Sequence, residues 1–231
     1  MTAALTVARK LARFRLAREL DGIWVDGLTE VRELVRRQPV LFCATHVAWW
    51  DGLVLLPVDE ALETDGRVLM DELQLQRLGF FRWLGALGLD RRSPAAMRHG
   101  LRHAAAFLDR AGRALWMFPQ GRQRPAHLRP LGLHRGHELL ARTSGAAIVP
   151  VALTYAFRES PRAAALLSFG ATVDPPDLEA ALVAALDRVD AFVDTGAPAF
   201  SALVAPRGGR VDGSPFSRAL AWSARPRLTD G

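Results

Sequence analysis

The sequence predicts an α/β fold: a single domain with a mostly parallel sheet flanked by helices, preceded by an amphipathic N-terminal helix. Short apolar runs alternate with longer segments of helical periodicity over most of the chain. One run, PVLFCAT at residues 39–45, is continuously apolar, which is typical of a strand buried on both faces of a parallel sheet. The chain has 231 residues, half of them hydrophobic, which is enough for one domain with a substantial core.

Residues 1–20 are expected to form a basic amphipathic helix. Val7, Leu11 and Phe14 are spaced i, i+4 and i+7, which places them on one face of a helix. Five cationic residues between positions 9 and 18 occupy much of the remaining surface, and they interrupt any signal-peptide core. Such a helix suits contact with a membrane interface. Packing against the domain core is the alternative, and the two are compatible.

The body of the domain, residues 21–195, is expected to alternate strands with helices. Each strand is a short apolar run, and each helix carries apolar residues along one face. The tail, residues 196–231, is rich in Gly, Pro, Ser, Ala and Arg, so we expect partial disorder there. Strands are expected at 23–25, 39–45, 67–70, 114–118, 146–153 and 166–173, and helices at 28–37, 51–62, 72–87, 94–108, 134–144 and 178–193.

Glycine and proline residues modify three of these elements. Gly79 interrupts the helix expected at 72–87, and Gly145 closes the helix expected at 134–144. Pro150 lies inside the strand expected at 146–153. Because proline cannot donate to a strand ladder, Pro150 favours an edge position or a strand end.

The charge balance indicates anionic partners. The formal net charge is +6, and Lys10 is the only lysine, so arginine supplies nearly all the positive charge. Arginine binds phosphates and carboxylates with two hydrogen bonds, which favours nucleic acid, anionic lipid or phosphorylated small molecules. A codon bias explains the arginine-to-lysine ratio equally well, but it does not explain the net charge. Cys43 is alone, so it forms no intramolecular disulfide, which fits a reducing compartment.

The segment THVAWWDG at residues 45–52 follows the buried strand and opens the next helix. The carboxyl ends of strands are where α/β folds place their sites. His46 can act there as a general base if a carboxylate holds its second ring nitrogen. Asp51 meets it if the chain curls back between the turn and the first helical turn. Taken alone, the pair also fits two satisfied polar residues without catalytic function.

A second segment, WMFPQGRQRP at residues 116–125, also passes from a strand end into a loop. Gly121 permits close approach of the backbone to a ligand, and Arg122 and Arg124 are able to hold an anion. Taken alone, this segment also fits an ordinary solvated loop.

Five blocks in this order resemble the glycerolipid acyltransferases of the glycerol-3-phosphate and lysophosphatidic acid type. The resemblance covers roughly residues 20–175 and implies a glycerol-3-phosphate acyltransferase-like fold for the domain at 21–195. The blocks are His46-x4-Asp51, Gly88-Leu89-Asp90-Arg91, Phe118-Pro119-Gln120-Gly121, Leu133-His134-Arg135-Gly136 and Val149-Pro150-Val151-Ala152-Leu153.

The resemblance implies acyl transfer from acyl-CoA or acyl carrier protein to a hydroxyl of a lysophospholipid, a glycerol phosphate or another lipid. His46 would be the base and Asp51 its orienting partner, while backbone N–H groups near Gly121 would stabilise the oxyanion. No metal and no cofactor beyond the acyl donor is implied. The expected location is the cytoplasm, at the inner face of the cell membrane, with peripheral attachment. Phosphate binding would fall to Arg91, Arg122 and Arg124.

The sequence departs from the family pattern at two places. Gln120 stands where the family usually has glutamate, and an amide cannot pair with arginine as a carboxylate does. Gln120 and Gly121 remain candidate substrate contacts. Trp49 and Trp50 place two bulky aromatic rings inside the first motif, where they would line an acyl or isoprenoid pocket or pack in the core. These variants resemble a bacterial subgroup that acylates a sugar- or pigment-type lipid.

Other functions fit the residues less well. Cys43 lies in a buried run, where cysteines are usually inert, and the histidines 127, 134 and 137 lack an acidic or cysteine partner at metal-ligand spacing. The G-x-S-x-G motif of an α/β serine hydrolase is absent from the sequence. Nucleic-acid binding lacks a recognition motif, and the chain has one tyrosine for base stacking. A catalytically degenerate lipid-binding member of the same fold is the remaining alternative. Oligomeric state is left open.

Overall fold

The structure is a computed structural model that describes residues 3–158, 160–198 and 200–205. The helices are α1 (Ala3–Glu19), α2 (Leu28–Arg37), α3 (Asp51–Leu62), α4 (Glu72–Arg77), α5 (Phe80–Trp83), α6 (Pro94–Phe107), α7 (Gly136–Ser144) and α8 (Leu178–Thr195), with a 3-10 turn, η1 (Pro175–Asp177). The strands are β1 (Ile23–Asp26), β2 (Val40–Ala44), β3 (Asp65–Asp71), β4 (Leu87–Leu89), β5 (Arg113–Met117), β6 (Ala147–Phe157), β7 (Ala163–Phe169) and β8 (Ser201–Val204).

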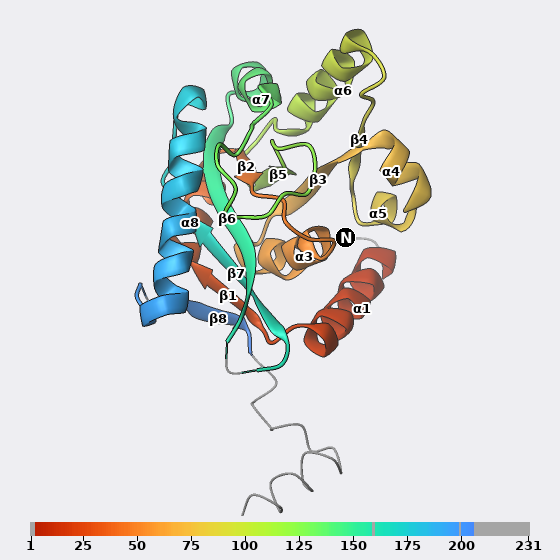
Figure 1. Ribbon diagram of the computed structural model, residues 1–231. Helices are drawn as coiled ribbons and strands as arrows, with labels where there is room; N and C mark the ends of the chain where they lie inside the picture. The colour runs from red at the N-terminus through yellow and green to blue at the C-terminus, as the bar shows by residue number, and fades with distance from the viewer. Residues whose placement is uncertain (1–2, 159, 199, 206–231) are drawn as a thin grey trace, which may run out of the picture.

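The described strands form one eight-stranded sheet in the order β4-β3-β5-β2-β6-β7-β1-β8 (Figure 1). From β4 to β6 in this order, each strand is parallel to the next. β7 is antiparallel to β6, β1 is parallel to β7, and β8 is antiparallel to β1. This arrangement confirms the predicted single α/β domain with a mostly parallel sheet.

Helices cover both faces of the sheet, which explains the continuous apolar run of β2. Successive side chains of a strand point to opposite faces, so Phe42 packs with α1 to α5 while Leu41 packs with α6, α7 and α8. Phe42 stacks on Trp116 of β5 with ring centroids 4.2 Å apart. The mostly apolar residues 39–58 are thus divided between a buried strand, a loop and the first part of α3. None of the described helices is long and apolar enough to cross a membrane.

The parallel strands bring two loops to one edge of the sheet. Cys43 of β2 is in register with Met117 of β5, so both strands end at the same level. β6 continues past this level to Phe157, and Thr45 binds it by two hydrogen bonds of 2.8 Å, one in each direction, with the backbone of Leu153. The loop that follows β2 therefore lies against the second half of β6.

Pro150 is at neither of the expected positions: β6 lies between β2 and β7, and it spans Ala147–Phe157, so Pro150 is also not at its end. The carbonyl of Pro150 accepts a hydrogen bond from the N–H of Gly170, the residue that follows β7. The carbonyl and the nitrogen of one strand residue point to the same side, so the nitrogen of Pro150 also faces this segment. The β6–β7 ladder ends at Val151 and Phe169. Proline is tolerated in this inner strand because no ladder bond is needed at that point.

Several element limits differ from expectation. The segment 72–87 divides into α4, α5 and the short strand β4, with the break at Gly79 as predicted. β7 spans Ala163–Phe169 rather than 166–173, because it pairs with β6 in an antiparallel hairpin. The described part of the tail adds β8, which was not predicted. The disorder predicted for the rest of the tail falls on residues outside those described.

The N-terminal helix has two apolar faces rather than one. Ala12, Leu16 and Leu20 are buried against the core. The predicted stripe points away from the core: the exposed fractions are 57% for Val7, 61% for Leu11 and 59% for Phe14. Packing on the core and an exposed apolar stripe therefore coexist, on different residues.

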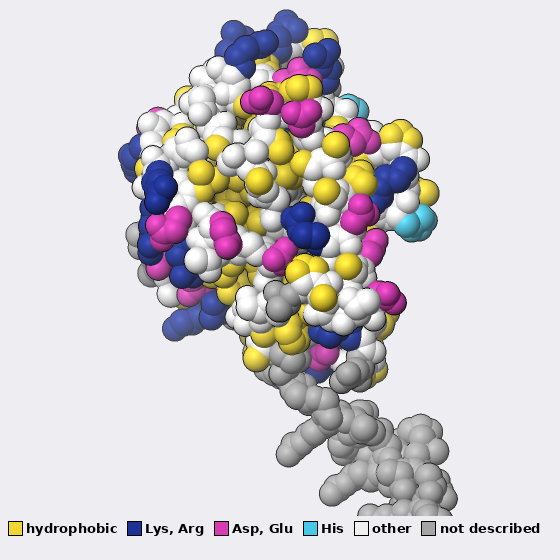
Figure 2. Space-filling model, turned by 90° about the vertical axis from the view of Figure 1, so that its left-hand side faces the viewer, with side chains coloured by type: hydrophobic (Ala, Val, Ile, Leu, Met, Phe, Trp, Pro, Cys, Tyr) yellow, Lys and Arg dark blue, Asp and Glu magenta, His cyan; other side chains and the backbone are white. Residues whose placement is uncertain are grey.

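The positive charge is not gathered on the face that α8 covers. Figure 2 views the molecule from the side on which α8 lies in Figure 1, and acidic, basic and apolar side chains are mixed over it. Asp187, Asp190 and Asp194 of α8 are exposed, and Arg188 pairs with Asp26. Among the described residues, this face therefore lacks the continuous basic surface that nucleic-acid binding requires.

Candidate active site

The loop between β2 and α3 brings His46 and Asp51 together. His46 lies in the turn that follows β2, and Asp51 is the first residue of α3. The chain curls back between them, so that Nδ1 of His46 lies 2.7 Å from Oδ2 of Asp51. Within the described residues, Nε2 of His46 has no hydrogen-bond partner, and 24% of its side chain is exposed. A carboxylate on Nδ1 favours the tautomer whose Nε2 accepts a proton.

Asp51 is fully buried and accepts four hydrogen bonds. Its Oδ2 takes the N–H groups of Val47 at 2.8 Å and Ala48 at 3.0 Å, in addition to His46. Its Oδ1 takes the hydroxyl of Tyr155 at 2.8 Å. No Lys or Arg of the described residues pairs with it. The start of α3 also favours a negative charge, so hydrogen bonds and the helix end together hold this carboxylate in the interior.

His46 is also fixed from the side of the second loop. Its ring stacks on Phe118, with centroids 4.3 Å apart and planes 23° apart. Its backbone N–H donates to Oε1 of Gln120 at 2.7 Å, and its carbonyl accepts from the N–H of Arg124 at 2.8 Å. The loop that follows β5 is therefore attached to the loop that follows β2, which explains why the two motifs occur together.

Gln120 is buried, with 4% of its surface exposed. Its Oε1 accepts from His46 and its Nε2 donates to the carbonyl of Leu131 at 3.4 Å. The amide therefore joins the two loops through both of its ends. Glutamate could accept from His46 but could not donate to Leu131. The structure gives Gln120 a positioning contact, and its contact with a substrate stays a prediction.

Gly121 forms a tight turn in the left-handed region, with φ +66°. A Cβ there would lie 2.9 Å from the ring of His134, so glycine fits both the turn and the close approach. Its own N–H donates to the carbonyl of Phe118 at 3.0 Å. The N–H groups of Arg122 and Gln123 make no hydrogen bond within the described chain. They are the better candidates to stabilise an oxyanion.

The three predicted phosphate-binding arginines reach this loop in different ways. Arg91 donates to the carbonyl of Gly121 at 3.0 Å, and Arg124 donates to the carbonyl of Leu131. Arg122 is exposed. The structure therefore places all three at or near the turn, each with donors on an exposed or half-buried side chain.

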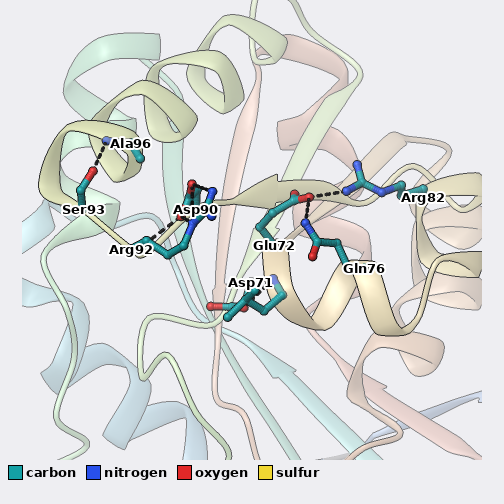
Figure 3. A network of polar contacts seen from close by, with 9 residues as sticks. Asp71, Glu72, Gln76, Arg82, Asp90, Arg92, Ser93 and Ala96 are labelled. Carbon is teal, nitrogen blue, oxygen red and sulfur yellow. Dashed lines mark hydrogen bonds and ion pairs between the residues drawn. The ribbon is translucent and has the colours of Figure 1, made fainter.

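Arg91 and its neighbour Arg92 differ in partner. Figure 3 shows Arg92 on Asp90, with Nη2 2.7 Å from Oδ2. This hydrogen bond lowers the pKa of Asp90 to about 2, so the pair persists across the physiological range. Ser93 follows and caps α6 through a bond to the N–H of Ala96. Arg92 is thus held within the turn before α6, while Arg91 is left to face the second loop.

The same view shows how the segment after β3 is held. Asp71 caps α4 by accepting from the N–H of Leu73 at 2.9 Å. Glu72 pairs with Arg82 of α5 at 2.5 Å and accepts from Gln76 at 3.3 Å. These contacts fix α4 and α5 next to each other, and Phe81 of α5 packs against the first turn of α3 near Gly52.

Trp49 and Trp50 have different environments. Trp49 is 48% exposed, whereas Trp50 packs against the buried core, and the rings meet edge to face with centroids 5.1 Å apart. Trp50 also lines a cavity of about 560 Å³. The loop after β2, the end of α1, β6 and the β6–β7 hairpin form its walls. The lining residues are Glu19, Leu20, Val47, Ala48, Trp50, Thr154, Tyr155, Phe157, Pro161, Arg162 and Ala163.

The structure disfavours Cys43 as a nucleophile. Cys43 is fully buried, and burial raises the pKa of its thiol far above its usual range, so it is a poor nucleophile. His137 is buried with its two ring nitrogens near the carbonyls of His134 and Pro175. The described residues contain no group of three or more metal-ligating side chains.

Sequence reasoning missed Tyr155. It lies 104 residues after Asp51, in the second half of β6, and nothing in the spacing of the two residues indicates their contact. The signal that could have found it is the pair of hydroxyl-bearing side chains, Thr154 and Tyr155, just after the apolar block Val149–Leu153.

A family model matches the part of the chain that contains these residues. The model for the family described as Acyltransferase matches residues 23–154, more than half of the chain. The matched region begins at β1 and ends one residue before Tyr155, and it contains His46, Asp51 and the loop after β5. No curated protein sequence matches the chain significantly.

Proposed function

This chain belongs to the acyltransferase family, and on that premise we propose that it forms an ester on a lipid. The donor is an acyl thioester, acyl-CoA or acyl carrier protein. The acceptor is a hydroxyl group of a lysophospholipid, a glycerol phosphate or another lipid such as a sugar- or pigment-type lipid. No metal takes part in the proposed reaction.

The observation that carries the proposal is the arrangement of His46. Its Nδ1 faces a buried carboxylate at 2.7 Å, while Nε2 is left for a substrate. A degenerate lipid-binding protein has no need to bury a carboxylate with four hydrogen bonds. The intact pair therefore favours catalysis over lipid binding alone.

The proposed reaction has two steps. Nε2 of His46 takes the proton of the acceptor hydroxyl while the oxygen attacks the thioester carbonyl carbon. The tetrahedral intermediate carries an oxyanion, for which the N–H groups of Arg122 and Gln123 are candidate donors. The carbon–sulfur bond then breaks, and the leaving thiolate takes the proton from His46. The products are the ester and the free thiol, and the enzyme returns to its starting state.

The basic loop supports an acceptor or donor that carries phosphate. Arg91, Arg122 and Arg124 lie at the turn that fixes His46, and guanidinium groups bind phosphate oxygens well. A phosphate held there would keep the reacting hydroxyl or the thioester near Nε2. Gln120 is occupied inside the protein, so we assign acceptor recognition to the arginines.

The test is release of free thiol from a panel of acyl-CoAs, with a total lipid extract as acceptor. The comparison is between wild type and His46→Ala, with His103→Ala on α6 as an exposed histidine control. We expect acceptor-dependent release that falls by about 10²- to 10⁴-fold in His46→Ala and persists in His103→Ala. Release that survives in His46→Ala would contradict the proposal. Absence of release with every acyl-CoA directs the same assay to acyl carrier protein, and failure there as well would sink it.

We also propose peripheral attachment to the cytoplasmic face of a membrane. The exposed stripe of Val7, Leu11 and Phe14 is flanked by the exposed cations Lys10 and Arg15, a pattern that suits an anionic lipid surface. Phe80 and Trp83 of α5 are 41% and 76% exposed. α1 and α5 both contact α3, the helix that carries Asp51.

Attachment is tested by co-sedimentation with vesicles that contain anionic lipid. Replacing Val7, Leu11 and Phe14 together by serine should move the protein to the supernatant, because the core contacts of α1 are made by other residues. Val193→Ser, at an exposed apolar position on α8, is the matched control. Unchanged binding of the triple variant would exclude the stripe as the anchor.

A further inference from the structure

The two oxygens of Asp51 have different sets of partners. Oδ2 accepts three hydrogen bonds, all from residues of its own loop: His46, Val47 and Ala48. Oδ1 accepts one, from the hydroxyl of Tyr155. Without this donor the described chain would leave Oδ1 buried and unsatisfied, and the carboxylate would be held at one oxygen alone. Tyr155 therefore fixes the rotation of the carboxylate whose other oxygen faces His46.

The hydroxyl of Tyr155 is positioned by the sheet and not by the loop that it contacts. Tyr155 pairs with Ala165 across the β6–β7 ladder, and its ring packs against the core on the α3 side. The loop itself is attached to β6 two residues earlier, where Thr45 binds the backbone of Leu153. A rigid strand thus supplies the reference point for the orientation of Asp51.

Tyr155 donates to Asp51 and does not itself ionise. Burial, followed by the charge of Asp51 and the hydrogen bond to it, raises the pKa of Tyr155 far above its usual range. The phenol therefore remains a neutral donor throughout the pH range in which an enzyme works. Its donation draws charge from a carboxylate that has no Arg or Lys partner among the described residues, and hydrogen bonds to charged groups are the stronger ones.

We infer that Tyr155 is a positioning residue for His46, acting through Asp51 to set the orientation of the imidazole and how tightly the pair holds its proton. The kinetic part of this inference rests on the proposed acyl transfer, while the control of His46 protonation does not. The hydroxyl of Tyr155 binds the oxygen of Asp51 that does not face His46, so it acts on His46 through the carboxylate.

The kinetic test uses Tyr155→Phe, which removes one oxygen and keeps the ring. We expect kcat to fall about ten-fold, equivalent to about 1.4 kcal/mol, with KM changed less than about two-fold because the ring that lines the cavity is kept. The acid limb of the pH–rate profile should move to higher pH. Loss of the phenol leaves more charge on Asp51, so the coupled pair retains its proton up to a higher pH. An unchanged profile with unchanged kcat would overturn the inference.

A double-mutant cycle tests whether Tyr155 acts through Asp51. In an Asp51→Asn background the phenol no longer faces a charged acceptor, so Tyr155→Phe should cost less than about two-fold. The same ten-fold cost in that background would show that Tyr155 acts on something else. Thr172→Val, an exposed hydroxyl outside the site, is the control and should leave kcat and the profile unchanged.

A measurement without turnover separates this inference from the proposed function. The chain has six histidines, and the NMR signal of the His46 ring is assigned by its loss in His46→Ala. In folded Tyr155→Phe the titration midpoint of that signal should rise by about half a pH unit or more, while the other five stay fixed. If wild type transfers no acyl group and the midpoint still rises, the proposed function fails and the role of Tyr155 stands. A fixed midpoint would overturn that role.

Discussion

Helix α3 carries one buried aspartate in its first turn and another in its third turn. The protein supplies different hydrogen-bond donors to the two. Asp51 accepts two backbone N–H groups, a tyrosine hydroxyl and a histidine. Asp59 accepts from Nε1 of Trp116 at 2.8 Å and from the hydroxyl of Thr64 at 3.0 Å, both at Oδ1. Burial raises the pKa of Asp59 to about 7, against these two bonds and the charge of Arg9, which lower it.

The position along the helix explains the difference. At the first turn the N–H groups of the incoming loop are free to solvate a carboxylate. By the third turn the helix uses its own N–H groups, so only side chains remain as donors. Both aspartates accept from an aromatic side chain of a neighbouring strand, Tyr155 or Trp116. Both carboxyl groups are buried, and the backbone donors at the start of the helix are what distinguish Asp51 from Asp59.

Asp51→Asn should have the largest effect and tests the catalytic side of this comparison. Because Oδ2 accepts from the backbone N–H groups of Val47 and Ala48, the oxygen of asparagine takes that position and the tautomer of His46 is kept. What is lost is the negative charge that stabilises the imidazolium formed during the reaction. We expect kcat to fall by about 10²- to 10⁴-fold, with little change in KM. The measurement is thiol release as a function of pH, and activity restored by high pH would contradict the explanation.

Gln120→Glu should have the next largest effect, because it places a third carboxyl group in the interior. One oxygen would accept from His46, but the other would face the carbonyl of Leu131 without a donor of its own. By the rule drawn from α3, we expect a loss of about 1–3 kcal/mol in the free energy of unfolding. Urea denaturation at pH 7 and pH 5 measures it, and the loss should be smaller at pH 5, where the carboxyl is protonated more easily.

Gln123→Glu is the matched control for this variant, since Gln123 is exposed in the same loop. It adds the same charge and should leave the stability almost unchanged. An equally stable Gln120→Glu would contradict the rule. It would mean that Arg124, which shares the carbonyl of Leu131 with Gln120, turns to neutralise the new carboxylate.

What the sequence could predict follows from how local each signal is. The strand at 39–45, the turn and the meeting of His46 with Asp51 depend on thirteen consecutive residues, 39–51. The contact of Tyr155 with Asp51 depends on the register of β6 against the loop, which no local pattern encodes. β8 is short and exists through pairing with β1. The burial of Gln120 was equally hidden, because a polar residue in a polar loop gives no sign that both ends of its amide are engaged.

The two apolar faces of α1 show the same limit. Helical periodicity identifies apolar stripes, and it cannot choose between Val7, Leu11 and Phe14 and the alternative set at positions 12, 16 and 20. The core of the domain makes that choice: Leu16 is 2% exposed, while Leu11 is 61% exposed. Tertiary packing thus decides which stripe is left for a partner.

Asp59→Asn should have the smallest effect and tests the other buried aspartate. The folded pKa of about 7 lies well above the usual value of an aspartate, so the native protein binds this proton more tightly than the unfolded chain does. The free energy of unfolding of wild type therefore falls as the pH rises from about 4 to 7, and the deficit remains above that range. Asparagine carries no charge, so it removes this dependence while its oxygen still accepts from Trp116 and Thr64.

The measurable quantity is the difference in free energy of unfolding between Asp59→Asn and wild type. Between pH 5 and pH 8, we expect the stability of the variant to rise relative to that of wild type by about 1 kcal/mol or more. Asp190→Asn, an exposed aspartate on α8, should show no such trend. Taking the difference cancels the histidines, which titrate in the same range in both proteins. A difference that does not change with pH would mean that Arg9 neutralises Asp59 in the folded state. The carboxylate in the third turn would then be stabilised by a cation, whereas the one in the first turn is stabilised by backbone donors.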